Sequence, residues 1–474
     1  MSLTRVPLQM QAGASLSFQH PVISSPPIVT SMQQLWAEGL SLRMCASGPV
    51  GDGSDCTAAM QKLATECAVH GFTGRIGRGD FVLSGTVVFD EAGATAVDAK
   101  RGGLVGEGPG STFLRSAFTG AAIRLVGGAS PGIALHGRFG DFLLIRDGLA
   151  KNGIGLQIDN YAWSDFERIG IYGFDNGMLA TDFLTSTLRR VTVRNNRRGL
   201  QFSYSDFSRP NALTFHDLEL GMNSEFGALI SEPATLSWLG GAVEGNGIGG
   251  TGEFGFRGGV ALINGGTEGA VGSTIGGVYF EYNSGNADLR IDHSSNEAVY
   301  ALRANTFNRI SSADFVTNNI VVAASEAANV IVDISACAFK GFNSYVEAAE
   351  RPYILNDTPA NAKVVVDDAT LFKSDLAYVD PARWGAAQRG GSVASTGVAT
   401  KLPRKWTSLK SSVGVYVVTH NLNTLDYAVT ADTNSASGNR VERVLQGLNS
   451  FTVVVTNAAG VAADDAFMFT MRRG

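Results

Sequence analysis

Apolar residues recur through the middle of the chain with spacings of 22 to 37 residues. Five segments share one template, in which the first, fourth and sixth positions are apolar, with one glycine exception, and the positions between them are polar or small. The template begins at Phe166, Leu188, Phe215, Trp238 and Ile275. This alternation predicts short strands, and a recurring period of this length is typical of repeat architectures. We therefore expect a solenoid of β-coils in which each coil packs on its neighbours.

The same template predicts which side chains face solvent. Successive side chains of a strand point to opposite faces, so the fifth and seventh positions should point outward if the apolar positions point inward. The seventh positions read Tyr172, Arg194, Gly221, Glu244 and Glu281, and the column continues at Asn308 and Lys340. The fifth positions read Gly170, Thr192, Glu219, Ala242, Tyr279, Thr306 and Ala338. Neighbouring coils lie about 4.8 Å apart, so Glu244 and Glu281 are expected to stack, with Glu219 one coil earlier.

These three glutamates are the candidate catalytic residues. Two carboxyl groups at such a separation resist ionising together, so one can keep a proton for use as a general acid. Glycosidases depend on a pair of this kind, and Glu219 could replace either member of the Glu244 and Glu281 pair. A single exposed glutamate could equally be an ordinary solvated residue. A stacked pair of glutamates favours a functional explanation, because like charges directly opposite each other destabilise a sheet.

Aromatic and basic residues near the pair are candidate substrate contacts. Tyr279, Tyr282 and Tyr172 could stack on sugar rings, and Arg194 lies in the same column. The alternative chemistry is β-elimination on a uronic-acid polymer, with Tyr279 or His216 as the base and Arg194 neutralising the substrate carboxylate. Three acidic residues would repel such a polymer, so hydrolysis ranks first.

Composition limits the classes of partner and cofactor. The net charge is −6, and lysine and arginine are scattered, which argues against a nucleic-acid partner. We expect no membrane insertion, because there is neither a long apolar run nor an apolar N-terminal signal, and we expect the chain to be made in the cytoplasm. The four cysteines form no C-x-x-C motif and have no histidine at ligand spacing, so no metal site and no cofactor are expected.

The chain divides into four parts by composition and pattern. We expect an attachment arm over 1–35, the β-helix over 36–382, a Gly/Ala/Ser/Thr-rich linker over 383–404 and a β-sandwich over 405–474. The β-helix part should open with a strand at 40–44 and a helix at about 57–69, which Ser54 or Asp55 could cap. The sandwich strands are expected at 414–419, 427–431, 451–456 and 467–471.

Three segments near the start carry a family resemblance. Gly51-Asp52-Gly53-Ser54-Asp55, Gly79-Asp80-Phe81-Val82-Leu83 and Leu104-Val105-Gly106-Glu107-Gly108 resemble the opening of pectate-lyase-like right-handed β-helices, especially bacteriophage tailspikes. The Val-Thr-His420-Asn421-Leu pattern resembles C-terminal modules of phage tail proteins, which suits trimerisation or, alternatively, carbohydrate binding.

The resemblance implies an all-β right-handed parallel β-helix with one short N-terminal helix and a C-terminal β-sandwich-like domain. It also implies a homotrimer in the virion tail that attaches to the tail or baseplate through its N-terminal segment. Such proteins bind, and often cleave, a bacterial surface polysaccharide such as a capsule or an O-antigen. With the glutamates, this favours an endo-glycosidase; a polysaccharide lyase and a non-catalytic receptor-binding tail protein are the alternatives.

Overall fold

The structure is a computed structural model. It describes residues 18–19, 29–30, 40–46, 50–91, 102–127, 134–135, 137–148, 150–205, 209–252, 254–265, 272–294, 296–309, 316–326, 328–341, 353–358, 360–367, 369–372, 389–401, 406–420, 427–433 and 438–472.

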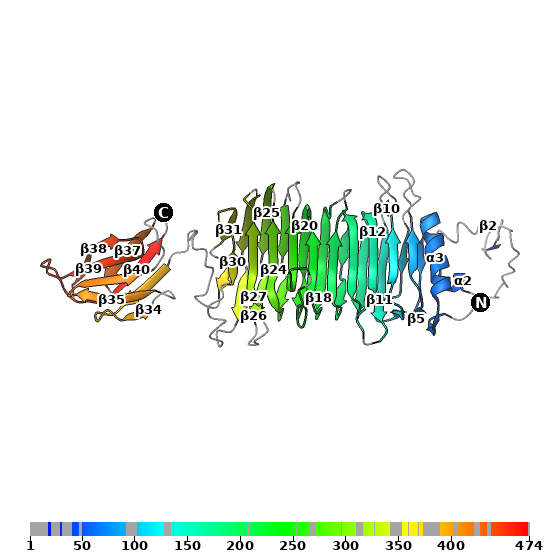
Figure 1. The fold of residues 1–474 in the computed structure, drawn as a ribbon, viewed down its shortest axis with the longest axis horizontal. Helices are drawn as coiled ribbons and strands as arrows, with labels where there is room; N and C mark the ends of the chain where they lie inside the picture. The colour runs from blue at the N-terminus through cyan, green and yellow to red at the C-terminus, as the bar shows by residue number, and fades with distance from the viewer. Residues whose placement is uncertain are drawn as a thin grey trace.

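The central part of the chain is a stack of coils built from two parallel sheets (Figure 1). The first, called here the long sheet, takes one strand from each coil. In spatial order its strands are β6 (Val87–Asp90), β9 (Ala121–Val126), β12 (Ile154–Ala162), β14 (Asn176–Leu184), β17 (Arg198–Ser203), β19 (Phe226–Ser231), β21 (Gly258–Asn264), β24 (Gly285–His293), β27 (Val316–Ala324) and β30 (Ile354–Asn356), with β10 (Ala134–Leu135) beside β12.

The second sheet, called here the bent sheet, takes two half-strands from most coils. Its strands are β3 (Asp52–Asp55), β4 (Thr73–Arg75), β5 (Gly79–Leu83), β7 (Gly103–Val105), β8 (Thr112–Ser116), β11 (Arg138–Arg146), β13 (Asp165–Tyr172), β15 (Thr187–Arg189), β16 (Thr192–Arg194), β18 (Leu213–Gly221), β20 (Thr235–Glu244), β22 (Gly272–Gly276), β23 (Tyr279–Glu281), β25 (Asn296–Arg303), β26 (Thr306–Arg309), β28 (Ala328–Ser335), β29 (Ala338–Gly341), β31 (Ala362–Val366) and β32 (Leu371–Phe372). All pairings in both sheets are parallel, so the expected parallel β-helix is confirmed.

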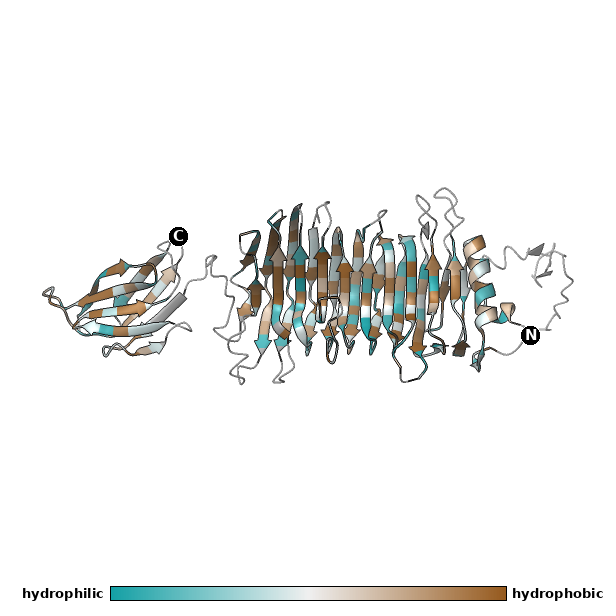
Figure 2. Ribbon diagram, in the orientation of Figure 1, coloured by the Kyte–Doolittle hydropathy of each residue, from teal (hydrophilic) through white to brown (hydrophobic). Residues whose placement is uncertain are grey.

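The register of the bent sheet follows the sequence template. Phe166 pairs with Leu188, Leu188 with Phe215, and Trp238 with Ile275. The apolar template positions are buried and form one continuous core along the stack, in which Trp238 and Phe280 are 0% exposed. Hydrophobic and hydrophilic residues alternate along many of these strands (Figure 2).

Single residues in the left-handed backbone region make two of the corners of each coil. One corner joins the two half-strands, at Arg168, Arg190, Asp217, Gly240 and Gly277 among others. The other leads from the bent sheet towards the long sheet, at Gly173, Asn195, Met222, Gly245 and Tyr282. Such conformations cost non-glycine residues about 1–2 kcal/mol each, so the packing of the coils must hold them in place.

Behind the second corner runs a ladder of buried asparagines. Asn196, Asn223, Asn246 and Asn283 each donate a side-chain N–H to a backbone carbonyl of the preceding coil, at 2.9 to 3.1 Å. The backbone N–H of Asn223 donates in turn to Oδ1 of Asn246 at 3.2 Å, and that of Asn246 to Asn283 at 3.0 Å. The ladder satisfies backbone groups that the turn would otherwise leave unpaired in the interior.

A helix lies at the N-terminal end of the stack (Figure 1). Helix α3 (Thr57–His70) buries Met60, Leu63 and Cys67, and its first N–H donates to the carboxylate of Asp55 at 2.9 Å, as expected. The strand expected at 40–44 is wrong: Ser41 makes only an isolated bridge to Arg75, and a short helix, α2 (Leu42–Cys45), follows it and buries Leu42. Neither helix is long and apolar enough to cross a membrane.

The expected arm over 1–35 lies almost wholly outside the described residues. Within this range the structure describes only β1 (Phe18–Gln19), which pairs antiparallel with β2 (Val29–Thr30). Residues 373–382, the end of the expected β-helix, and 383–388, the start of the expected linker, are likewise outside the described residues.

The C-terminal part is a sandwich of two antiparallel four-stranded sheets. One sheet contains β34 (Ala399–Lys401), β33 (Arg389–Val393), β40 (Phe467–Arg472) and β37 (Ala428–Thr433); the other contains β35 (Thr407–Ser412), β36 (Val415–Thr419), β39 (Ser450–Thr456) and β38 (Arg440–Gln446). The linker expected over 383–404 is therefore wrong for β33 and β34. Their composition is that of a linker, but β33 pairs with β40 along five residues and Val393 is buried in the sandwich core.

Candidate functional site

The bent sheet brings together the residues that the two outward columns predicted. Gly221 pairs with Glu244, Glu244 with Glu281, and Glu281 with Asn308. In the neighbouring column Glu219 pairs with Ala242, which pairs with Tyr279. The stacking of Glu244 on Glu281 is thus confirmed at the level of the backbone register.

The two stacked glutamates differ in their surroundings. Both are half-buried. The Glu281 carboxylate accepts a hydrogen bond from the side-chain amide of Asn308, which also donates to the hydroxyl oxygen of Tyr279 at 3.2 Å. The Glu244 carboxylate has no hydrogen bond or ion pair with any residue that the structure describes. One member of the pair is therefore held in place, and the other is available to a substrate.

Glu219 is held by a basic partner. Arg194 forms an ion pair with its carboxylate, and the Thr192 hydroxyl donates to the same carboxylate at 3.3 Å. A Cβ atom at Gly221 would lie 2.8 Å from Nε of Arg194, so the arginine side chain passes across this bare position. Glu219 therefore balances the charge of Arg194 and is less suited to be the second catalytic carboxyl than Glu244 or Glu281.

The tyrosines of the site hold their protons. Burial, with a further contribution from the Glu281 carboxylate, raises the pKa of Tyr279 above its usual value. Burial and the Glu219 carboxylate likewise raise the pKa of Tyr172, which heads the column. Both side chains can donate hydrogen bonds to a ligand at neutral pH, but neither is suited to act as a phenolate base.

Beside the glutamates, the second corner exposes apolar side chains. Met222, Gly245 and Tyr282 directly follow Gly221, Glu244 and Glu281 and belong to successive coils. Met222 is 60% exposed and Tyr282 is 44% exposed, with only glycine between them. Tyr282 is therefore an exposed aromatic residue at the corner that follows Glu281, as its prediction as a sugar contact requires.

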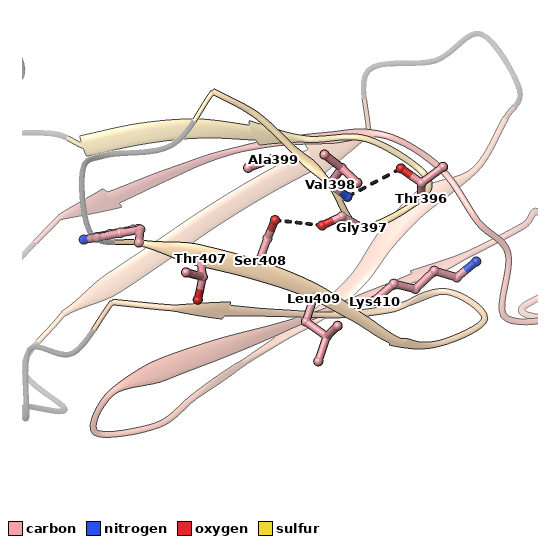
Figure 3. A pocket seen from close by; sticks show the side chains of 9 residues that line it. Thr396, Gly397, Val398, Ala399, Thr407, Ser408, Leu409 and Lys410 are labelled. Atoms are coloured by element: carbon pink, nitrogen blue, oxygen red, sulfur yellow. Dashed lines mark hydrogen bonds between the residues drawn. The ribbon is translucent and has the colours of Figure 1, made fainter.

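A hollow in the sandwich (Figure 3) differs from the site on the bent sheet because the aromatic ring that lines it is buried. It is lined by residues 396–399 and 406–410, where the Ser408 hydroxyl donates to the carbonyl of Gly397 at 2.8 Å. Its Trp406 is only 8% exposed and stacks on Phe469 in the core, so little of the ring is free for a sugar. His420 is also a core residue: it packs against Tyr427, and burial lowers its pKa.

Sequence reasoning missed the groups that hold the site in place. Thr192, Gly221 and Asn308 were assigned to the columns but given no role, and the asparagine ladder was not noticed. A signal for the ladder exists, because an asparagine stands eight positions after the template start at Asn196, Asn223, Asn246 and Asn283. Among the described residues, no group of three or more His, Cys, Asp or Glu side chains could hold a metal ion.

Comparison with known proteins yields structural likeness only. No protein-family model and no curated protein matches the sequence. The A-module of a mannuronan C-5 epimerase from Azotobacter vinelandii is 15% identical, with 70% of this chain and 95% of that chain covered and a TM-score of 0.45. For the Dettilon tailspike protein the identity is 10%, the coverages are 93% and 95%, and the TM-score is 0.46.

The enzymatically active domain of tailspike protein 2 from bacteriophage CBA120 is 12% identical, with 92% of this chain and 70% of that chain covered and a TM-score of 0.48. Identities this low do not transfer an activity, so the assignment of the fold rests on the strand pairings. By those pairings the chain is an all-β protein whose central part is a parallel β-helix.

Proposed function

We propose that this protein is a phage tailspike that binds a bacterial surface polysaccharide and cleaves its glycosidic bonds with Glu244 and Glu281. One observation carries the proposal: two half-buried glutamates are paired in register on neighbouring strands of a rigid sheet. Facing like charges are unfavourable in a sheet, and catalytic sites are where such pairs are retained. The tailspike resemblance of the segments between residues 51 and 112 supplies the class of substrate.

The reaction would add one water molecule across the glycosidic bond. As the bond between the anomeric carbon and the leaving oxygen breaks, its electron pair goes to that oxygen, which takes a proton from one glutamic acid. The other glutamate either deprotonates the attacking water or first forms an ester with the anomeric carbon that water then hydrolyses. In the first course the water proton ends on the base and returns to the acid through solvent; in the second, the ionised acid takes the proton of the hydrolysing water directly. The pair then ends as it began.

Two features favour hydrolysis over β-elimination. Elimination needs a base for the sugar C5 proton, and the raised pKa of Tyr279 disfavours its phenolate form, which leaves His216 on β18 as the remaining candidate base. Elimination also needs a cation on the substrate carboxylate, whereas Glu219 already neutralises Arg194. The exposed ring of Tyr282 supports a stacking contact with a sugar next to the cleaved bond.

The wider assignment follows from the same proposal. A homotrimer, attachment to the phage tail or baseplate through the N-terminal segment and action outside the bacterial cell are expected of a tailspike. We assign the sandwich to trimerisation before carbohydrate binding, because its aromatic residues are largely buried in its own core.

The test is cleavage of a panel of purified capsular and O-antigen polysaccharides, measured as new reducing ends and as loss of chain length. Glu244→Gln and Glu281→Gln should each lower the rate on the cleaved polymer by at least about 100-fold and leave polymer binding intact. Glu167→Gln, on the outward face of β13, is the matched control and should change little.

Three outcomes would contradict parts of the proposal. Full activity in both variants would rule out this site. An ultraviolet-absorbing unsaturated product would favour elimination. Binding without any loss of chain length would identify a receptor-binding protein that is not an enzyme.

A further inference from the structure

Asn308 connects two groups of the candidate site through one side-chain nitrogen. It lies on β26, next to Glu281 in the outward column. Its Nδ2 donates to Oε1 of Glu281 and, at 3.2 Å, to the hydroxyl oxygen of Tyr279. Because one amide group serves both acceptors, the positions of the carboxylate and the phenol depend on each other through it.

The hydrogen bond also distinguishes the two glutamates chemically. An amide N–H stabilises a carboxylate more than a neutral carboxylic acid, because the acceptor carries the charge. Glu281 has such a donor, whereas Glu244 has none among the described residues. This arrangement fixes the Glu281 carboxylate and leaves the Glu244 carboxylate without a donor among the described residues.

We propose that Asn308 is a positioning residue that orients the Glu281 carboxylate as the base or nucleophile and leaves Glu244 as the proton donor. This inference rests on the proposed function, since the two roles have meaning only for glycosidic cleavage. Asn308 itself does not touch the reacting atoms in this scheme. It acts by holding the Glu281 carboxylate and the Tyr279 hydroxyl in fixed positions relative to each other.

The kinetic test compares two substitutions of similar size on the polymer that the wild-type protein cleaves. Asn308→Leu removes the donor and should lower kcat at least about tenfold while KM changes less than about twofold. Asn308→Asp replaces the donor by a carboxylate that repels the Glu281 carboxylate, so kcat at pH 7 should fall at least as far as in Asn308→Leu. Thr306→Val, on the same strand and also facing outward, is the control and should retain activity.

A second measurement does not depend on the polymer. Ultraviolet difference titration of the phenols, with Tyr279 identified by Tyr279→Phe, follows ionisation of Tyr279 directly. The Asn308 donor lowers the pKa of Tyr279 against the larger effect of burial, so Asn308→Leu should move this titration to higher pH. Melting curves of each variant would establish that it is folded.

The results separate the two proposals. If the wild-type protein cleaves no polymer but the Tyr279 titration moves as expected, the proposed function fails and the Asn308 contact stands without a catalytic role, which overturns the inference. If the polymer is cleaved through Glu244 and Glu281 but Asn308→Leu keeps kcat within about twofold of wild type, the proposed function stands and the inference is wrong. An unchanged Tyr279 titration also contradicts it.

Discussion

Glu91 is a carboxylic acid that the fold has removed from water. It directly follows β6 and is only 4% exposed. Burial raises the pKa of its carboxyl group to about 7. The folded protein therefore retains a proton there over a pH range in which the unfolded chain, with an ordinary glutamate, has already lost it.

This difference predicts that acid stabilises the protein at this residue. Because the folded pKa is raised, the contribution is fully present below about pH 4.5 and is lost as the pH rises to about 7. The loss should be of the order of 1–3 kcal/mol in the free energy of unfolding. Glu91→Gln should flatten the change in unfolding midpoint between pH 5 and pH 8, and exposed Glu107→Gln should not. Equal pH dependence in Glu91→Gln and wild type would contradict this account.

The sequence predicted which side chains point into the core and which point outward better than it predicted which side chains contact each other. Strand alternation was sufficient to put Phe280 inside the coil and Tyr279 and Glu281 outside it. It could not show that Arg194 crosses Gly221 to reach Glu219, because that path depends on side-chain torsions and on the missing Cβ atom. The same holds for the contact of Asn308 with Glu281.

Among the elements, the asparagine ladder has a stabilising role that can be measured. Asn223 accepts the backbone N–H of Asn196 at 3.0 Å and donates to the carbonyl of Val193 at 3.0 Å. Asn223→Leu would leave these buried groups unpaired and should lower the free energy of unfolding by about 2–4 kcal/mol. Asn211→Leu, at an exposed turn position, should have little effect. Similar melting of both variants would show that water replaces the ladder.

Elements were predictable where their residues form the core. The strands expected near 451–456 and 467–471 match β39 and β40, which supply Phe451, Phe467 and Phe469 to the sandwich. The strands β35 and β38 were missed because their residues are mostly polar and lie at the edges of their sheet. Edge strands need fewer buried residues, so their pattern is weak.

At the scale of the whole molecule, two hydrophobic cores are separate. The core of the coils and the core of the sandwich share no residue. Calorimetry of the full chain should therefore show two transitions. A fragment of residues 383–474 should fold and melt within a few degrees of one of them, and a chain ending at residue 382 should reproduce the other. A single transition, or an unfolded fragment by circular dichroism, would contradict this independence.

The division of each coil into inward-facing and outward-facing residue positions affects how the sequence of such a protein can evolve. In the outward columns almost every coil carries a different residue, and the fold remains the same: Thr192, Ala242 and Tyr279 occupy equivalent places. Surface substitutions of this kind typically change stability by less than about 0.5 kcal/mol. Mutation can therefore change the outward side chains one coil at a time, while selection for folding acts mainly on the inward positions.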